Sequence, residues 1–184
     1  AELISRFGTE EQKSGTLPRL VNGQAIMGTA ITEPYGGCDV TGAVTTAVRE
    51  GDHWVLNGTK MFATNGTVAD FLLIFCRTDP ENPNRHKRFS FILVPTDAPG
   101  FTATKIHGKM GIRASDTAEL ALNNVRVPVT NLVGKAGEGF YELMYFFNHT
   151  RLHICVGTGG LARSALEEAI RYTKERKQYG APLA

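Results

Sequence analysis

The chain has 184 residues, a length that suits one domain or one domain with pieces of others. Hydrophobic residues make up 42% of it, which is typical of a folded globular protein and excludes disorder as its main description. The formal net charge of +2 gives no reason to expect a nucleic-acid partner or an anionic membrane. No apolar run is long enough to span a bilayer. Three widely separated cysteines favour a reducing compartment over a disulfide framework, and neither they nor the histidines have metal-site spacing.

Residues 1–23 carry a helix start but too little apolar periodicity to fold alone. Thr9 is a capping residue, and acidic residues follow it in the first turn. Pro18 lies past the first turns of a helix begun there, so we expect that helix to be short or bent. The segment is predicted to be the remnant of an N-terminal helical domain.

Residues 24–134 are predicted to form short strands joined by tight turns, without helices between them. The predicted strands cover residues 43–49, 53–60, 71–77, 89–94, 101–106 and 117–127. In the second strand Trp54 and Leu56 alternate with His53 and Val55, and Asn57-Gly58 is a turn or bulge signal. Consecutive strands favour a mainly β fold, with an antiparallel β-barrel or sandwich as the middle domain.

Residues 135–184 change to a helical period, and we expect them to begin a C-terminal helical domain with one long helix. Leu161, Ala165 and Ala169 recur four residues apart. The glycines within 157–160 either allow close helix packing or mark a break in the helix. Helical segments without partners at both ends suggest that the chain is an excised piece of a larger protein.

Five motifs follow one another in a fixed order along the chain. They are residues 30–42 (AITEPYGGCDVTG), 57–66 (NGTKMFATNG), 110–117 (MGIRASDT), 127–134 (VPVTNLVG) and 176–180 (RKQYG). Together they resemble the signatures of the acyl-CoA dehydrogenase family, and the resemblance covers nearly the whole chain. Cys38 stands where the family has serine or threonine, and Phe62 where it usually has tryptophan.

The resemblance implies that the middle domain binds FAD. Backbone N–H and hydroxyl groups around Ile31 and Thr32 are expected to contact the pyrimidine side of the flavin. Thr64 is expected to bond near N5, and Phe62 to cover the ring face turned away from the substrate. Cys38 is expected beside the flavin diphosphate and the acyl-CoA substrate, where a thiol donates more weakly than a hydroxyl.

The helical part holds a second set of expected contacts. Arg151 and Arg176 would lie about 37 Å apart along an unbroken helix, so one ligand group cannot meet both. The resemblance implies that Asn148 and Arg151 bind the CoA portion of the substrate. It also implies that Arg176 and Gln178 reach the flavin diphosphate of a neighbouring subunit, in a homo-oligomer that is a tetramer by analogy.

The activity implied by the resemblance is FAD-dependent α,β-dehydrogenation of an acyl-CoA thioester to the trans-2-enoyl-CoA, a step of fatty acid β-oxidation. Electrons would pass to an electron-transferring flavoprotein or a similar acceptor, in the cytoplasm or the mitochondrial matrix. The family's base is a glutamate, usually far downstream and in one subgroup directly before the arginine matching Arg151. Thr150 stands there and cannot be the base. We therefore expect the base beyond Ala184, no catalytic residue within the chain, and no turnover by this fragment alone.

Three alternatives remain open at this stage. The first is an acyl-CoA oxidase or a flavin monooxygenase relative, which would share the fold and differ in the reactivity of its reduced flavin with oxygen. The second is a non-catalytic binding protein of the same fold, like the DNA-associated relatives, although the net charge argues against nucleic acid. The third is a β-barrel module without a cofactor.

Overall fold

The computed structural model describes all of residues 1–184, and the chain divides into two compact units, Ala1–Leu143 and Met144–Ala184. No helix in the structure combines the length and the apolar character needed to cross a membrane. The predicted domain boundaries, at residues 23/24 and 134/135, stay predictions.

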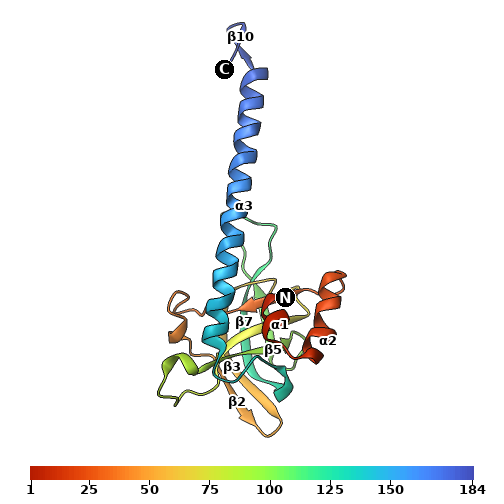
Figure 1. Cartoon of the computed structure of the whole chain (residues 1–184), viewed down its shortest axis with the longest axis vertical. Coiled ribbons are helices and arrows are strands. Elements are labelled where there is room, and N and C mark those ends of the chain that lie inside the picture. The colour runs from red at the N-terminus through yellow and green to blue at the C-terminus, as the bar shows by residue number, and fades with distance from the viewer. The chain divides into compact units, whose positions relative to one another are not determined.

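An eight-stranded mixed sheet forms most of the first unit (Figure 1). Its strands run in the order β6-β7-β3-β2-β4-β5-β8, and β1 pairs with β4 beside that path. Their bounds are β1 Met27–Ala30, β2 Thr46–Glu50, β3 His53–Thr64, β4 Phe71–Arg77, β5 Phe89–Pro95, β6 Phe101–Lys105, β7 Thr117–Pro128 and β8 Leu132–Val133. Most pairs are antiparallel, as predicted, so the mainly β fold class is confirmed.

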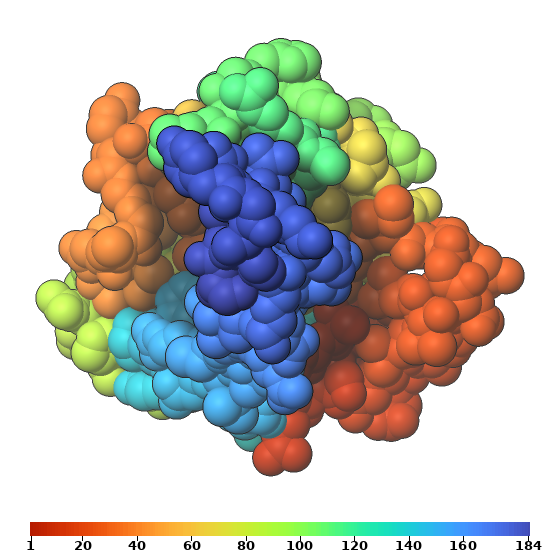
Figure 2. All heavy atoms as spheres, turned by 90° about the horizontal axis from the view of Figure 1, so that it is seen from above, coloured from red at the N-terminus to blue at the C-terminus, as the bar shows by residue number.

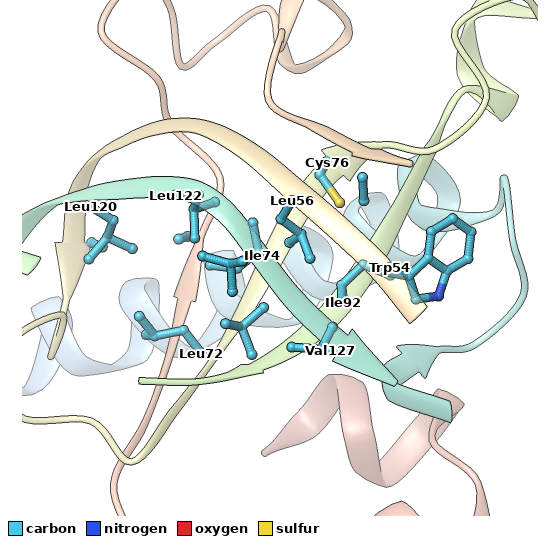
Figure 3. Close-up of a cluster of buried hydrophobic side chains, with 14 of the residues drawn as sticks. Trp54, Leu56, Leu72, Ile74, Cys76, Ile92, Leu120, Leu122 and Val127 are labelled. Atoms are coloured by element: carbon cyan, nitrogen blue, oxygen red, sulfur yellow. The ribbon is translucent and has the colours of Figure 1, made fainter. Parts of the chain in front are cut away.

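The core lies between the strands β3, β6 and β7 and the strands β1, β4 and β5, because each group contributes its inward-facing side chains. Figure 3 shows Leu56 from β3, Ile74 from β4 and Ile92 from β5 gathered in the middle of this cluster, with Trp54 at one end of it. Leu72, Ile74 and Ile92 are fully buried. A sheet that surrounds one apolar core in this way agrees with the predicted barrel or sandwich.

β4 is buried on both faces, which explains its unbroken apolar sequence. On the face opposite the core, Phe75 stacks on Phe89 with ring centroids 4.9 Å apart. The buried Leu3 and Ile4 of α1 (Glu2–Phe7) and the buried Leu143 belong to the segments outside the sheet. The buried side chains of α1 therefore belong to the same compact unit as the sheet, whose strand β4 is apolar on both faces.

Some expectations about local structure were wrong. β1 and β4 run parallel, and so does the single bridge between β2 and β4, so the sheet is mixed. The short strands β1 and β8 and the helix α1 carried too weak a pattern to be predicted. Val55 is buried like its neighbours and does not alternate with them. The helix α2 (Glu10–Val21) has the expected cap at Thr9, which forms a capping box with Gln12, but the helix continues past Pro18 for three residues.

The second unit consists of the rest of α3 (Gly139–Glu175) and a small hairpin of β9 (Lys177–Gln178) and β10 (Ala181–Pro182). The glycines within 157–160 do not break α3, and a Cβ added to any of them would meet nothing within 4 Å. The structure therefore excludes a break in the helix at these glycines.

Candidate functional site

Two predicted site segments run side by side at one edge of the first unit. The Met61 N–H donates to the carbonyl oxygen of Thr32 over 2.8 Å. Four residues earlier, Gly28 lies against the carbonyl of Thr64, since a Cβ on it would be 2.4 Å from that oxygen. Residues 28–32 therefore run antiparallel to residues 61–64, and Thr32 and Thr64 lie about 10 Å apart along this edge.

Phe62 is turned outward here by a β-bulge. Lys60 pairs with Leu120 and Ala63 with Ala118, so Met61 and Phe62 together oppose one residue of β7. Phe62 takes a left-handed backbone with φ of 57°, and it is 61% exposed. In a regular strand, Phe62 would share the inward face of Lys60. The bulge gives that inward position to Ala63 and presents the aromatic ring at the surface.

The loop after β1 is closed by Glu33. Its backbone exchanges hydrogen bonds with Gly36, which makes a tight turn around Pro34. Its carboxylate accepts from the N–H groups of Val44 (2.7 Å) and Thr45 (3.0 Å), at the far end of the loop. One side chain thus ties both ends of the segment that carries the first motif.

Lys60 meets Glu33 from β3. Its ammonium donates to Glu33 Oε1 over 2.8 Å and to the carbonyl oxygen of Ile31 over 3.0 Å. The Lys60 side chain has no exposed surface, and that of Glu33 is 5% exposed. Sequence reasoning gave neither residue a role. The signal was present, because the period that places Trp54 and Leu56 inward also places a lysine on the core face.

The turn after Thr64 is held by Asp116. Its carboxylate accepts from the Thr67 N–H over 2.9 Å and from the Thr67 hydroxyl over 2.8 Å. Burial alone would raise the pKa of Asp116, but these bonds and the nearby Lys105 and Lys109 outweigh it and hold that pKa below its usual value. The third motif (residues 110–117) therefore stabilises, through Asp116, the turn that follows the second motif (residues 57–66).

Cys38 lies farther along the loop after β1, where it is exposed and free. Beside it, Asp39 accepts from the Thr41 hydroxyl (2.7 Å) and begins a short 3-10 helix over Val40–Gly42. Figure 2 shows the loop after β1 (orange) and the loop between β6 and β7 (green) as separate protrusions of the first unit. Cys38 is on the same loop as Thr32 and follows Gly37, on which a Cβ would come within 3.1 Å of Thr32 Cγ2.

The remaining predicted site residues belong to the second unit. Asn148 and Arg151 are neighbours on α3, with Arg151 Nη1 3.2 Å from Asn148 Oδ1. Arg176 follows the end of the helix, and Gln178 lies in β9. Because α3 is unbroken, Arg151 and Arg176 lie about 37 Å apart along it, and they cannot contact the same ligand group.

Comparisons with known proteins now decide the family. The family model described as acyl-CoA dehydrogenase, middle domain, matches residues 28–125, and the model of its C-terminal domain matches residues 137–184. The chain belongs to the acyl-CoA dehydrogenase family. Its middle-domain match contains both segments of the edge described above, from Gly28 to Thr64.

Individual relatives agree with this assignment. The short-chain-specific acyl-CoA dehydrogenase of Clostridium acetobutylicum is 43% identical over 100% of this chain and 48% of its own length. The acyl-CoA dehydrogenase structure from Geobacillus kaustophilus is 39% identical, with a TM-score of 0.94 over 99% of this chain and 48% of that one. The glutaryl-CoA dehydrogenase of Mycobacterium smegmatis in complex with FADH2 is 43% identical, with a TM-score of 0.89 over 98% and 45% of the two chains. The chain spans about half the length of the relatives it matches.

Proposed function

We propose that the protein containing this chain is an FAD-dependent acyl-CoA dehydrogenase that converts an acyl-CoA thioester to the trans-2-enoyl-CoA. The observation that carries the proposal is the edge made by residues 28–32 and 61–64, which brings two motifs of the family together. In this proposal residues 24–134 are the flavin- and acyl-CoA-binding middle domain. Residues 1–23 would belong to an N-terminal helical domain, and residues 135–184 would begin the C-terminal one.

The groups at this edge suit a flat, polar-edged ring. Phe62 offers an exposed aromatic face, on which a second ring can stack. The hydroxyls of Thr32 and Thr64 have no hydrogen-bond partner within the chain. Gly37 leaves room beside Thr32, since a Cβ there would come within 3.1 Å of Thr32 Cγ2. Free donors around an open aromatic face are the set that an isoalloxazine needs.

When bound, FAD supplies the acceptor for the hydride that leaves the β-carbon of the substrate. In this proposal the residues of the chain bind the flavin and orient it. Ile31 and Thr32 would hold the pyrimidine side, and Thr64 would donate near N5. Phe62 would cover the ring face away from the substrate and exclude water from it. Cys38 would lie near the diphosphate and the acyl-CoA.

No carboxylate at this edge is free to remove the α-proton. Glu33 is buried, and its oxygens already accept from Lys60, Val44 and Thr45. Thr150 carries a hydroxyl that donates to the carbonyl oxygen of Phe147 in its own helix. We therefore propose that the base is a glutamate outside residues 1–184, which matches the arrangement found in most of the family.

The second unit would supply contacts at two further places. Asn148 and Arg151 would bind the CoA portion of the substrate, and Arg176 with Gln178 the flavin diphosphate of a neighbouring copy. The length of α3 between the two arginines supports this division. We further propose a homotetramer that passes its electrons to an electron-transferring flavoprotein or a similar acceptor. The free cysteines support a reducing compartment, either the cytoplasm or the mitochondrial matrix.

The test uses the natural-length protein. Purified with FAD, it should show flavin absorbance, which should bleach under anaerobic conditions when acyl-CoA thioesters of increasing chain length are added, with enoyl-CoA as the product. Rapid reoxidation of the reduced flavin by oxygen would instead favour an oxidase or monooxygenase relative. Bound flavin without bleaching, together with retarded migration of DNA, would favour a binding protein. A protein that takes up no flavin would overturn the proposal.

A further inference from the structure

The buried ion pair of Glu33 and Lys60 connects three parts of the chain. Glu33 joins the start of the loop after β1 to its end at Val44 and Thr45, and Lys60 joins both to β3. Removing two charges from water is unfavourable, and a hydrophobic pair of similar volume often gives equal or greater stability. Stability alone therefore does not explain why a lysine lies in this core.

The surroundings make the pair depend on its own hydrogen bonds. The Lys60 ammonium lies 5.9 Å from the centroid of the Phe75 ring, and the fully buried Cys76 is close to it. Burial alone would raise the pKa of Glu33, but the Lys60 ammonium and the bonds from Val44 and Thr45 outweigh it and hold that pKa below its usual value. The charged carboxylate is thus held at one place by donors from two directions.

These bonds fix the residues of the proposed flavin edge. The carbonyl of Ile31 accepts from Lys60, and the carbonyl of Thr32 accepts from Met61. Thr32 is therefore held from both sides, by Ile31 before it and Glu33 after it. Two residues beyond Lys60, the chain enters its left-handed turn at Phe62. The position of the Thr32 hydroxyl relative to the Phe62 ring is thus set through Lys60.

We propose that Glu33 and Lys60 are a positioning pair, which sets the distance and angle between the Thr32 donors and the Phe62 ring and so orients the isoalloxazine. The inference rests on the proposed function, because it requires that FAD binds at this edge. Neither residue contacts the flavin in this proposal. Their effect passes through the main chain of residues 31, 32 and 61.

The natural-length protein with Lys60→Met and with Glu33→Gln tests the proposal, through the Kd for FAD and the visible circular dichroism of the bound flavin. We expect Lys60→Met to raise the Kd about tenfold, which is about 1.4 kcal/mol, because the main chain of Thr32 would no longer be held in register with Phe62. The visible dichroism should change shape in the fraction that keeps its flavin. Glu33→Gln, which keeps the size of the side chain, should act in the same direction and to a smaller extent.

Two controls separate positioning from general destabilisation. Arg126→Met removes a cation from the exposed pair of Arg126 in β7 with Glu50 in β2, which are 2.7 Å apart across the intervening strand β3. Val127→Ala opens a cavity in the core away from the edge. Both should leave the flavin dichroism as in the wild type, whatever their melting temperature.

The outcomes are distinct. Unchanged Kd and dichroism in Glu33→Gln and in folded Lys60→Met would overturn the positioning role and leave the proposed function standing. If Lys60→Met does not fold, Glu33→Gln alone decides. A wild-type protein that binds no FAD would overturn the proposed function itself.

Discussion

Gly28 lies so close to Thr64 that a methyl group on it would be 2.4 Å from the Thr64 carbonyl oxygen and 2.5 Å from Leu72 Cδ2. Since one neighbour is main chain and the other a core side chain, neither can move away freely. The close approach is what allows the β1 segment to run beside the end of β3.

Gly28→Ala should therefore lower the free energy of unfolding by about 1–3 kcal/mol, as overpacking does, and weaken FAD binding by displacing Thr64. Urea unfolding and flavin titration measure the two effects. Gly15→Ala in α2 is the matched control, because nothing lies within 4 Å of its added methyl. It should stabilise the protein by about 0.5–1 kcal/mol, the usual gain in a helix interior. Equal effects of the two substitutions would contradict the prediction.

Phe62→Gly should separate stability from cofactor binding. A left-handed backbone destabilises the folded state by about 1–2 kcal/mol at a residue with a side chain. The exposed ring of Phe62 offsets little of this, because little of its surface is buried. The unfolding free energy should stay the same or rise, while the affinity for FAD falls because the stacking face is lost. Phe62→Trp keeps an aromatic face at the same φ and should retain the flavin. Undiminished FAD binding by Phe62→Gly would show that the ring does not contact the cofactor.

Glu142, in the first turn of α3, should make stability depend on pH. Burial raises the pKa of Glu142 to about 7, and the charge of Glu138 adds to this. Its Oε2 has no partner. An acid with a raised folded-state pKa binds its proton more tightly in the folded state, so the protein should lose stability as the pH rises from about 4.5 to about 7.

Glu142→Gln removes this titration and should stabilise the protein by about 3 kcal/mol at pH 8, with no gain at pH 4. Denaturant unfolding at a series of pH values measures it. Glu119→Gln, on the exposed side of β7, is the control for loss of a surface carboxylate. A gain that is the same at pH 4 and pH 8 would mean that Glu142 does not titrate in this range.

The cysteines should differ in reactivity. Burial raises the pKa of Cys76 to about 12, and its side chain is inaccessible, whereas Cys38 is exposed. In a Cys155→Ser background at pH 8, a thiol reagent should modify Cys38 and leave Cys76 unmodified until the protein unfolds. FAD or acyl-CoA should slow the modification of Cys38. Modification at an unchanged rate with both ligands present would place Cys38 away from either site.

Much of the fold could be predicted from sequence, because its strands carry strong local patterns. β4 was predicted with its observed bounds, and β5, β6 and β7 to within one residue, since each is an apolar or alternating run between turn residues. β1 was missed because its four residues, Met-Gly-Thr-Ala, owe their structure to pairing with the distant β4. Asn57-Gly58 predicts a turn or a bulge, and in the structure it lies inside β3 at an irregularity of the ladder with β7.

The site divides in the same way. The first two motifs of the sequence contain Thr32, Phe62 and Thr64, and the structure brings these residues to the edge formed by residues 28–32 and 61–64. The motifs do not indicate which contacts stabilise that edge. The hydrogen bond from Met61 to Thr32 and the close approach of Gly28 to Thr64 both depend on tertiary packing. Lys60 is the exception, since a charged residue at an inward position already requires a buried partner.

The ladder between β3 and β7 contains a second irregularity that compensates for the first. Between the Leu56–Val125 and Gly58–Leu122 pairs the extra residue lies on β7, near the left-handed Asn124, whereas at Phe62 it lies on β3. The offset introduced at Asn124 is therefore cancelled at Phe62, and both ends of the ladder keep one common frame. Deleting either residue alone would force one end to slip by a position and exchange its inner and outer side chains. A variant that loses both insertions would keep the frame at the two ends of the ladder, but it would lose the outward-facing ring.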